Sequence, residues 1–300
     1  MMSTSYNNLK YKLSVPPEVG LSDLMRLGLN TEGSAGIGSV KDYLIELEDV
    51  LISSHAPLYL PEYKEFTAIR LNYASTDDEF RIVSKNYVLA HIESASKYKN
   101  LKQVNMHPTP KYWKHTDKHT GDVSISEGDY NKLIDTIREI GSFAEARGIE
   151  IVLENNAIHW PDGTVNPSWE KVDVNSFDEW SFGSSPEEWI RICEDVDRVN
   201  VKLCLDSSHA CTYALGMKDE DKEKEVMKYV SRPDLIRHVH WNDNYLYDDR
   251  GMNDSHAALN QGTLPTELHR VIKYLDATLL LEHFYSIENL EEELQFIDSL

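Results

Sequence analysis

Six residues that could bind a metal ion each stand at the end of a short apolar run. They are His55, His107, Glu154, Asp206, His240 and Glu282. A carboxylate at the end of a buried run is costly to desolvate unless it is paired with a cation or bound to a metal. Imidazole and carboxylate groups together are typical ligands of borderline divalent cations. The six residues therefore predict a divalent-metal centre, provided that the fold brings them together.

Three further candidates lie close to this set in the sequence. His209 stands three residues after Asp206, and the segment after His240 contains Asp254-Ser255-His256. Taken singly, a histidine in such a place is more often structural, and an acidic residue is often the cap of the next helix. The metal prediction therefore depends on the joint pattern.

The apolar runs have the pattern of β-strands buried on both faces. They are continuous and do not alternate with polar residues, which is typical of parallel strands covered by helices. The expected strands are Leu9–Val15, Val50–Ser54, Lys102–His107, Glu150–Glu154, Val201–Asp206, Ile236–Trp241 and Thr278–Glu282. A weaker signal at Leu27–Gly33 marks a candidate eighth strand.

Amphipathic helices are predicted between the strands. Ser75 and Ser126 each precede an acidic residue by three positions and are expected to cap helices. Ser185-Pro186-Glu187-Glu188 is a capping box with proline at the first helical position. The last helix is expected at about Glu288–Leu300.

Seven or eight strand–helix units in 300 residues favour an α/β fold of the (β/α)₈ TIM-barrel type, with residues 1–300 as a single domain. A doubly wound open sheet is the alternative, but no glycine-rich phosphate-binding motif follows any expected strand. In a barrel the carboxyl ends of the strands meet at one mouth, so the candidate ligands are expected to converge there.

Two long segments, Pro108–Val123 and Asn155–Ser184, are expected to be loops near the mouth. The second begins directly after Glu154, so it is predicted to be a lid that contacts substrate through His159 and Trp160. Trp241 is a third candidate for substrate binding, because an indole can stack on a sugar ring. The alternative for these tryptophans is packing alone.

The composition restricts the partners and the setting. With 51 acidic and 30 basic residues, the formal net charge is −21, which argues against nucleic acid or an anionic membrane as a partner. Small ligands and metal cations fit this charge better. No apolar run is long enough to span a membrane. The three cysteines form no C-x-x-C motif and the start lacks the apolar part of a secretory signal, so a cytoplasmic setting is expected. The oligomeric state stays open.

In sequence order, seven motifs resemble those of the divalent-metal (β/α)₈ barrels that include endonuclease IV and the xylose-isomerase-like sugar isomerases and epimerases. The resemblance runs from about residue 50 to 285. The motifs are His55-Ala56-Pro57, Asn105-Met106-His107-Pro108, Leu153-Glu154-Asn155, Leu205-Asp206-Ser207-Ser208-His209-Ala210, His238-Val239-His240-Trp241-Asn242-Asp243, Asp254-Ser255-His256-Ala257-Ala258-Leu259-Asn260-Gln261-Gly262 and Leu281-Glu282.

The resemblance implies one to three divalent ions per chain, zinc or manganese, held by nine residues. The first set would be His55, His107 and Glu154. Glu154 would bridge to a second set that also contains Asp206, His240 and Glu282. The third set would be His209, Asp254 and His256. The isomerases and epimerases of the superfamily use mainly the second set, in which the two glutamates also act as acid and base.

Two reactions follow from the resemblance. The favoured one is isomerisation or epimerisation of a small sugar, sugar phosphate or polyol ketone, in which Glu154 and Glu282 move a proton through a metal-stabilised enediolate. The alternative is phosphoester hydrolysis like that of endonuclease IV, which the full nine-residue set favours. The chain departs from that enzyme after Glu154, where Asn155-Asn156 stands, and at Asn260, where glycine is expected. A catalytically inactive metal- or sugar-binding barrel is a third hypothesis.

Overall fold

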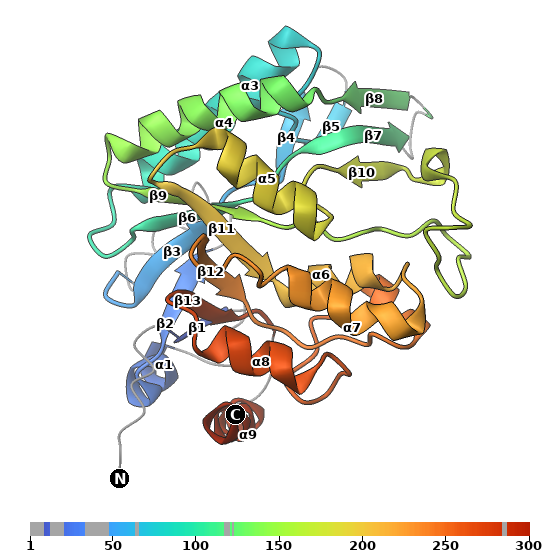
Figure 1. Cartoon of the computed structure of the whole chain (residues 1–300). Helices are drawn as coiled ribbons and strands as arrows, with labels where there is room; N and C mark the ends of the chain where they lie inside the picture. The colour runs from blue at the N-terminus through green and yellow to red at the C-terminus, as the bar shows by residue number, and fades with distance from the viewer. Residues whose placement is uncertain are drawn as a thin grey trace.

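Eight parallel strands close into a barrel in the computed structural model, which describes residues 9–12, 21–33, 48–63, 66–116, 121, 123–283 and 287–300 (Figure 1). The predicted (β/α)₈ barrel is confirmed. Around the barrel the strands are β1 (Leu9–Lys12), β2 (Asn30–Gly33), β3 (Leu51–His55), β6 (Gln103–Met106), β9 (Glu150–Glu154), β11 (Val201–Asp206), β12 (Ile236–His240) and β13 (Thr278–Leu281).

The first strand closes the barrel against the last. Leu9 pairs with Leu279 of β13, while Lys10 also pairs with Asn30 of β2. The weak eighth signal is therefore a real strand, although it is only four residues long and begins after a helix that ends at Leu27. The predicted extension of the first strand to Val15 lies outside the described residues.

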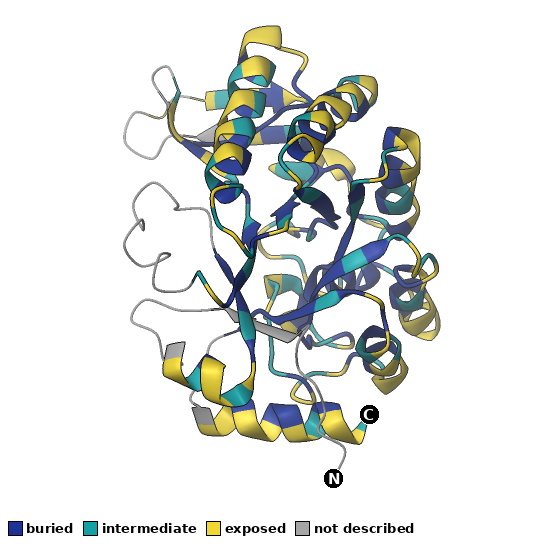
Figure 2. Cartoon of the chain, turned by 90° about the vertical axis from the view of Figure 1, so that its left-hand side faces the viewer, coloured by how far each residue is buried: buried dark blue, intermediate teal, exposed yellow. Residues whose placement is uncertain are grey.

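Helices surround the strands, and their surfaces alternate between buried and exposed residues (Figure 2). In α4, for example, Leu133, Ile137, Ile140 and Ala144 recur every three or four residues and are all buried, which makes one apolar stripe. The helices are α1 (Leu21–Leu27), α3 (Asp78–Ala95), α4 (Tyr130–Glu145), α5 (Pro186–Val196), α6 (Ser207–Ala214), α7 (Asp219–Lys228), α8 (Thr266–Lys273) and α9 (Ile287–Ser299), with short 3₁₀ turns at Val174–Ser176 and Asp249–Asn253. Among the described helices, none has the length and apolar character needed to cross a bilayer.

Two predicted helix caps are wrong and one is confirmed. Asp77, not Ser75, caps α3, and its side chain accepts the backbone N–H groups of Glu79 and Phe80. Asp129, not Ser126, caps α4, because Ser126 lies within a strand. In both cases a carboxylate accepts the free N–H groups and also interacts favourably with the helix dipole. Ser185 caps α5 as predicted.

The two segments that were expected to be loops contain strands and pair with each other. The first contains β7 (Pro110–Thr116), which pairs antiparallel with β8 (Val123–Glu127), a strand that begins at the last residue of this segment. From the second segment, β10 (Glu179–Ser181) pairs with β7. A separate hairpin, β4 (Tyr59–Tyr63) and β5 (Phe66–Arg70), follows β3. These additions follow strands β3, β6 and β9, so they stand beside the carboxyl end of the barrel (Figure 1).

Candidate metal centre

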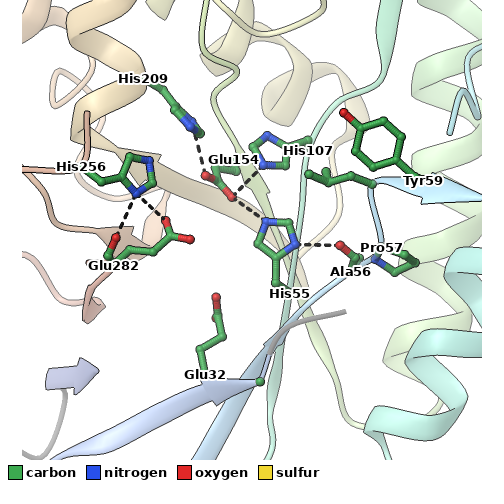
Figure 3. A pocket seen from close by; sticks show the side chains of 12 residues that line it. Glu32, His55, Ala56, Pro57, Tyr59, His107, Glu154, His209, His256 and Glu282 are labelled. Carbon is green, nitrogen blue, oxygen red and sulfur yellow. Dashed lines mark hydrogen bonds and ion pairs between the residues drawn. The ribbon is translucent and has the colours of Figure 1, made fainter. Parts of the chain in front are cut away.

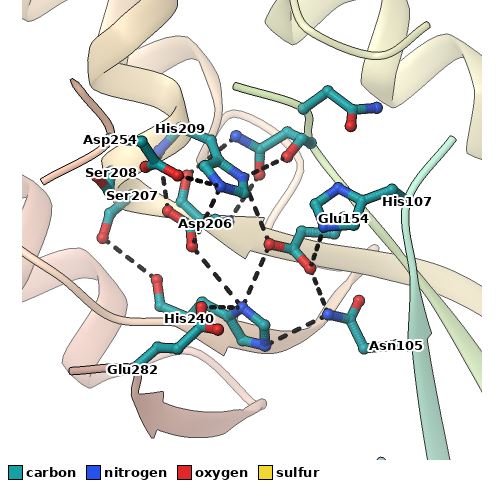
Figure 4. Close-up of polar contacts among 12 residues, drawn as sticks. Asn105, His107, Glu154, Asp206, Ser207, Ser208, His209, His240, Asp254 and Glu282 are labelled. Atoms are coloured by element: carbon teal, nitrogen blue, oxygen red, sulfur yellow. Dashed lines mark hydrogen bonds and ion pairs between the residues drawn. The ribbon is translucent and has the colours of Figure 1, made fainter. Parts of the chain in front are cut away.

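At the carboxyl end of the barrel all nine predicted ligands lie in three groups. Figure 4 shows part of this arrangement, around Glu154, Asp206 and His240. Within each group, the atoms that could bind a metal lie within 4.8 Å of one another. The first group is His55, His107 and Glu154; the second is Glu154, Asp206, His240 and Glu282; the third is Asp206, His209, Asp254 and His256. Glu154 belongs to the first two groups and Asp206 to the last two, so the groups form one continuous centre.

In the first group, two imidazoles approach one carboxylate oxygen. His55 Nε2 and His107 Nε2 each lie 3.3 Å from Glu154 Oε2. His55 Nδ1 lies 2.7 Å from the carbonyl of Ala56, which can only accept a hydrogen bond. Nδ1 therefore carries the hydrogen, and in a neutral ring Nε2 presents its lone pair to the centre of the group. This is the tautomer that a metal ligand requires.

The second group contains three carboxylates and one imidazole, all buried. His240 Nδ1 lies 2.6 Å from Glu282 Oε2, 3.2 Å from Glu154 Oε1 and 3.7 Å from Asp206 Oδ2. Despite these neighbours, His240 Nδ1 has no partner of hydrogen-bond geometry within the described residues. Three buried carboxylates surround one nitrogen, and a divalent cation would balance their negative charge. This group therefore fits a metal.

Glu154 turns one oxygen toward each of these two groups. Its Oε2 faces the first group and its Oε1 faces His240, and the residue is 1% exposed. Asn105, which the sequence analysis did not select as a ligand, donates a hydrogen bond to Oε2 through its side-chain amide. A carboxylate held in this way fits the bridging position that the resemblance implies.

The third group repeats the tautomer pattern of the first. His209 Nδ1 lies 2.8 Å from the carbonyl of Asn155, and His256 Nδ1 lies 2.9 Å from the carbonyl of Glu282. Both rings therefore direct Nε2 toward Asp254, at 3.1 Å for His209 and 3.2 Å for His256. Two imidazole lone pairs that converge on two carboxylates fit a third divalent cation.

The loop that carries Asp254 and His256 is fixed by another carboxylate. Asp243 accepts the backbone N–H groups of Asn244, Asn260, Gly262 and Leu264 at 2.8–3.1 Å. Asn260, which replaces an expected glycine, has a φ of 69°. Asparagine tolerates this left-handed conformation better than most residues, so the backbone of the motif is kept.

The charges of the centre act strongly on one another. Burial would raise the pKa of Glu154, but the neighbouring His107 and His240 hold it well below its usual range. Burial would lower the pKa of His256, but the hydrogen bond to Asp254 and the charge of Asp206 raise it to about 9. The pKa of His209 is raised well above its usual range against burial, chiefly by Asp206 and Asp254. The field that favours positive charge on these imidazoles is also the field that would attract a metal cation.

A cavity of about 440 Å³ opens above the centre (Figure 3). Its lining has a polar side of carboxylates and imidazoles and an apolar side formed by Pro57, Leu58 and Tyr59. Among the described residues, no lysine or arginine lines it. The complete lining is Glu32, Gly33, His55, Ala56, Pro57, Leu58, Tyr59, His107, Glu154, His209, His256 and Glu282. Its volume is in the range of small-molecule sites.

The three predicted substrate contacts lie elsewhere. His159 and Trp160 line a separate cavity with Trp113 and Glu179, and no side chain of residues 155–184 lines the cavity above the centre. The predicted lid instead packs on α6, where Trp160 Nε1 donates to the carbonyl of Thr212 at 2.9 Å.

Trp241 is fully buried, which does not fit the predicted contact with substrate. Its Nε1 donates to His269 Nδ1 of α8 at 3.0 Å. Trp241 therefore packs the barrel against α8. Its position at the end of a strand could not reveal this, because side chains near the end of a barrel strand can point toward either the mouth or the helices.

Sequence reasoning also missed Glu32, which lines the cavity from β2. Burial would raise the pKa of Glu32, but His238 and His240 hold it well below its usual range. The sequence feature that could have identified Glu32 is its position as an acidic residue near the end of the weakly predicted eighth strand.

The fold and these groups define a (β/α)₈ barrel with a candidate divalent-metal centre at its carboxyl end. The chain belongs to the xylose isomerase-like TIM barrel family, whose model matches residues 34–300.

Comparison with known proteins finds a similar sequence and similar structures. The chain is 28% identical over 223 residues to the uncharacterized protein MJ1311 of Methanocaldococcus jannaschii, and the match covers 73% of this chain but only 61% of that protein. A D-tagatose 3-epimerase-like protein superposes with a TM-score of 0.59 at 23% identity, over 97% of this chain and 98% of its own. The TTHB071 protein of Thermus thermophilus, in a structure soaked with ZnCl₂, gives a TM-score of 0.61 at 17% identity, over 97% of each chain. At these identities the two structures show the shared fold.

Proposed function

We propose that this protein is a divalent-metal-dependent isomerase or epimerase of a small carbohydrate. The observation that carries the proposal is the second group, in which Glu154, Asp206, His240 and Glu282 converge from four strands beside the cavity. The epimerase-like protein among the structural neighbours supports a carbohydrate substrate.

In this proposal, Glu154, Asp206, His240 and Glu282 hold the catalytic cation. When bound there, a divalent cation would polarise two adjacent substrate oxygens and so acidify the C–H bond between them. Glu154 and Glu282 are the acid and base that remove and return the proton. Glu282 lines the cavity and is 8% exposed, so a substrate can reach its carboxylate.

The lining of the cavity supports a neutral substrate. Pro57, Leu58 and Tyr59 offer an apolar surface for the C–H face of a sugar, and the opposite side offers carboxylates and imidazoles for its hydroxyl groups. Because no lysine or arginine among the described residues lines the cavity, a phosphate group would have to rely on the metal for its counter-charge. The proposed setting is cytoplasmic, and the three free, buried cysteines are consistent with it.

A second candidate function is hydrolysis of a small phosphoester. The observation that favours it is the completeness of the first and third groups, which an isomerase that uses only the second group would not need. Multi-metal centres clamp the attacking and leaving oxygens of a phosphoryl group. The net charge of −21 still argues against nucleic acid as the substrate.

One experiment separates the two functions. The zinc- or manganese-loaded protein is incubated in deuterated water with a panel of ketohexoses and ketopentoses, and in ¹⁸O-labelled water with bis(p-nitrophenyl) phosphate. Deuterium incorporated next to a sugar carbonyl, together with a new isomer, supports the isomerase. Release of ¹⁸O-labelled phosphoester product without sugar exchange supports the hydrolase and overturns the first proposal. Metal binding without either reaction supports an inactive barrel.

A further inference from the structure

Glu32, which is not one of the nine candidate ligands, lies inside the barrel next to the second group (Figure 3). It belongs to β2, and its side chain is 4% exposed. A buried carboxylate needs partners that offset its desolvation. Its partners show what it does.

Both carboxylate oxygens of Glu32 face histidines of the same strand, β12. Oε1 lies 3.1 Å from His240 Nε2, and Oε2 lies 3.1 Å from His238 Nε2. The hydroxyl of Ser53 donates to Oε2 at 2.5 Å. His238 is held from its other side, where Nδ1 lies 3.0 Å from the carbonyl of Thr278. Ser53 and His238, which are not among the nine candidate ligands, therefore help to fix Glu32 in place.

The contact with His240 affects which ring nitrogen can bind a cation. Glu32 Oε1 lies 3.1 Å from His240 Nε2, whereas the side-chain amide nitrogen of Asn105 lies 3.3 Å away and makes its shorter contact with Glu154 Oε2. His240 enters the second group through Nδ1. In a neutral imidazole, a lone pair at Nδ1 requires the hydrogen to be on Nε2, and a carboxylate is the strongest acceptor for that hydrogen. Glu32 thus favours the tautomer that binds a metal through Nδ1 and makes the ring a more basic ligand.

The other imidazoles of the centre have weaker partners at their outer nitrogens. In His55, His209 and His256 the shortest contacts of these nitrogens are with neutral backbone carbonyls, at 2.7, 2.8 and 2.9 Å. Carboxylate oxygens lie farther away, Glu154 Oε1 at 3.4 Å from His209 Nδ1 and Glu282 Oε2 at 3.8 Å from His256 Nδ1. His107 Nδ1 has no hydrogen-bond partner in the described part of the chain. Within those residues, His240 is therefore the candidate ligand whose outer nitrogen has a carboxylate oxygen as its shortest contact.

We propose that Glu32 is a positioning residue that fixes the tautomer and orientation of His240, and that it makes the second group the tightest metal site of the centre. The effect is strongest for this group, because among the described residues Glu32 pairs with His240 and with no imidazole of the other two groups. The proposal concerns metal affinity and holds for either candidate reaction.

The test measures zinc and manganese binding by competition with a chelator in the wild-type chain and in Glu32→Gln. The variant keeps the size of the side chain and an oxygen that can accept from His240, but it loses the charge. We expect the tightest binding event to weaken about 10- to 100-fold, while the remaining events change less than about 3-fold. Ser53→Ala, which only loosens Glu32, should weaken the same event by a smaller factor.

A second readout follows the tautomer directly. Nitrogen-15 spectra of the imidazole groups in the zinc-loaded protein should show His240 with its hydrogen on Nε2 in the wild type, and a shifted Nε2 signal in Glu32→Gln. Glu225→Gln is the matched control, since Glu225 is a buried carboxylate of α7 that pairs with Lys228 away from the centre. It should change neither readout.

Three outcomes would overturn the proposal. Equal weakening of every binding event would mean that Glu32 acts only through its overall charge. Loss of one complete equivalent of metal would make Glu32 a ligand itself. Unchanged affinity together with an unchanged His240 spectrum would leave Glu32 as a structural residue.

Discussion

The carboxylate of Asp206 acts on His209 through the backbone as well as through space. Asp206 Oδ1 accepts the backbone N–H of His209 at 2.9 Å and so caps α6, while Asp206 Oδ2 faces His240 of the second group and His256 of the third. The same side chain therefore lies in the centre and sets the start of the helix that brings another candidate ligand to it. Loss of Asp206 should disturb two groups at once.

Asp206→Ala is expected to lower bound metal and to abolish activity together. Asp206→Asn should also lose metal affinity, because the amide is a weaker ligand, but it can still cap α6. In the metal-free state the two variants should therefore differ by about 1 kcal/mol in the free energy of unfolding, with the asparagine variant more stable. Metal analysis and urea unfolding check this. An alanine variant with full metal content and full activity would contradict the assignment.

Glu282→Gln separates metal binding from proton transfer. Glutamine keeps the size and one ligand oxygen of Glu282 but cannot accept a proton. We expect most of the metal to be retained and turnover to fall at least about 100-fold, which is the usual scale for the loss of a general base. Deuterium exchange into the substrate should fall by a similar factor. Full activity in this variant would exclude Glu282 as the base.

Asp243→Asn is expected to remove one metal equivalent without unfolding the barrel. The carboxylate accepts four backbone N–H groups of the loop that carries Asp254 and His256. The asparagine amide replaces one carboxylate oxygen of Asp243 by a donor. The backbone N–H groups bound to that oxygen therefore lose hydrogen bonds worth about 1.5–3 kcal/mol each. Metal analysis should show loss of the ion bound by the third group, with the other ions retained. Simultaneous loss of every equivalent would show that the loop is not independent of the other groups.

Arg70 and Glu179 form an ion pair that links the β4–β5 hairpin to β10. Arg70 Nε lies 3.1 Å from Glu179 Oε1, and the two side chains are 9% and 15% exposed. Removing either partner leaves the other group largely buried and unsatisfied, so Arg70→Met or Glu179→Gln should destabilise the chain by about 1–3 kcal/mol. The double variant should recover part of this loss in a double-mutant cycle. If the double variant loses the exact sum of the two single losses in the free energy of unfolding, the ion pair contributes nothing to stability.

Trp160→Ala should reduce stability and leave substrate affinity unchanged. Trp160 is 9% exposed and packs against Trp169 and Phe177, with ring centroids 4.6 and 5.8 Å away. Truncation of a buried tryptophan costs about 3–5 kcal/mol. Thermal unfolding and KM should be measured together. A large rise in KM with an unchanged melting temperature would restore the predicted role in substrate binding.

The nine candidate ligands could be selected from the sequence because most of them end apolar strands or stand beside them. Glu154 and Asp206 are the clearest cases, since the expected and observed strands have the same bounds. Glu32 was missed because its strand, Asn30–Gly33, contains no apolar run. Its role depends on partners in β3 and β12, far away in the sequence, and no local pattern records them.

The strands of the two long segments were missed for a related reason. The pairing of β10 with β7 joins Trp180 to Tyr112, and such a pair depends on the barrel that holds both segments in place. Trp241 was misassigned because an aromatic residue at a strand end has the same sequence signal whether it faces the mouth or the helices. The structure separates the two through its hydrogen bond to His269.

The order of the ligands along the chain, together with the closing of β1 against β13, has a consequence for biosynthesis. The second group needs residues from Glu154 to Glu282, and the barrel wall beside Glu282 is complete only when Leu9 pairs with Leu279. A nascent chain therefore cannot assemble the four-residue group until the residues up to Glu282 have left the ribosome. We expect tight metal uptake to be a late step that reports barrel closure, and chains truncated before Glu282 to bind the cation only weakly.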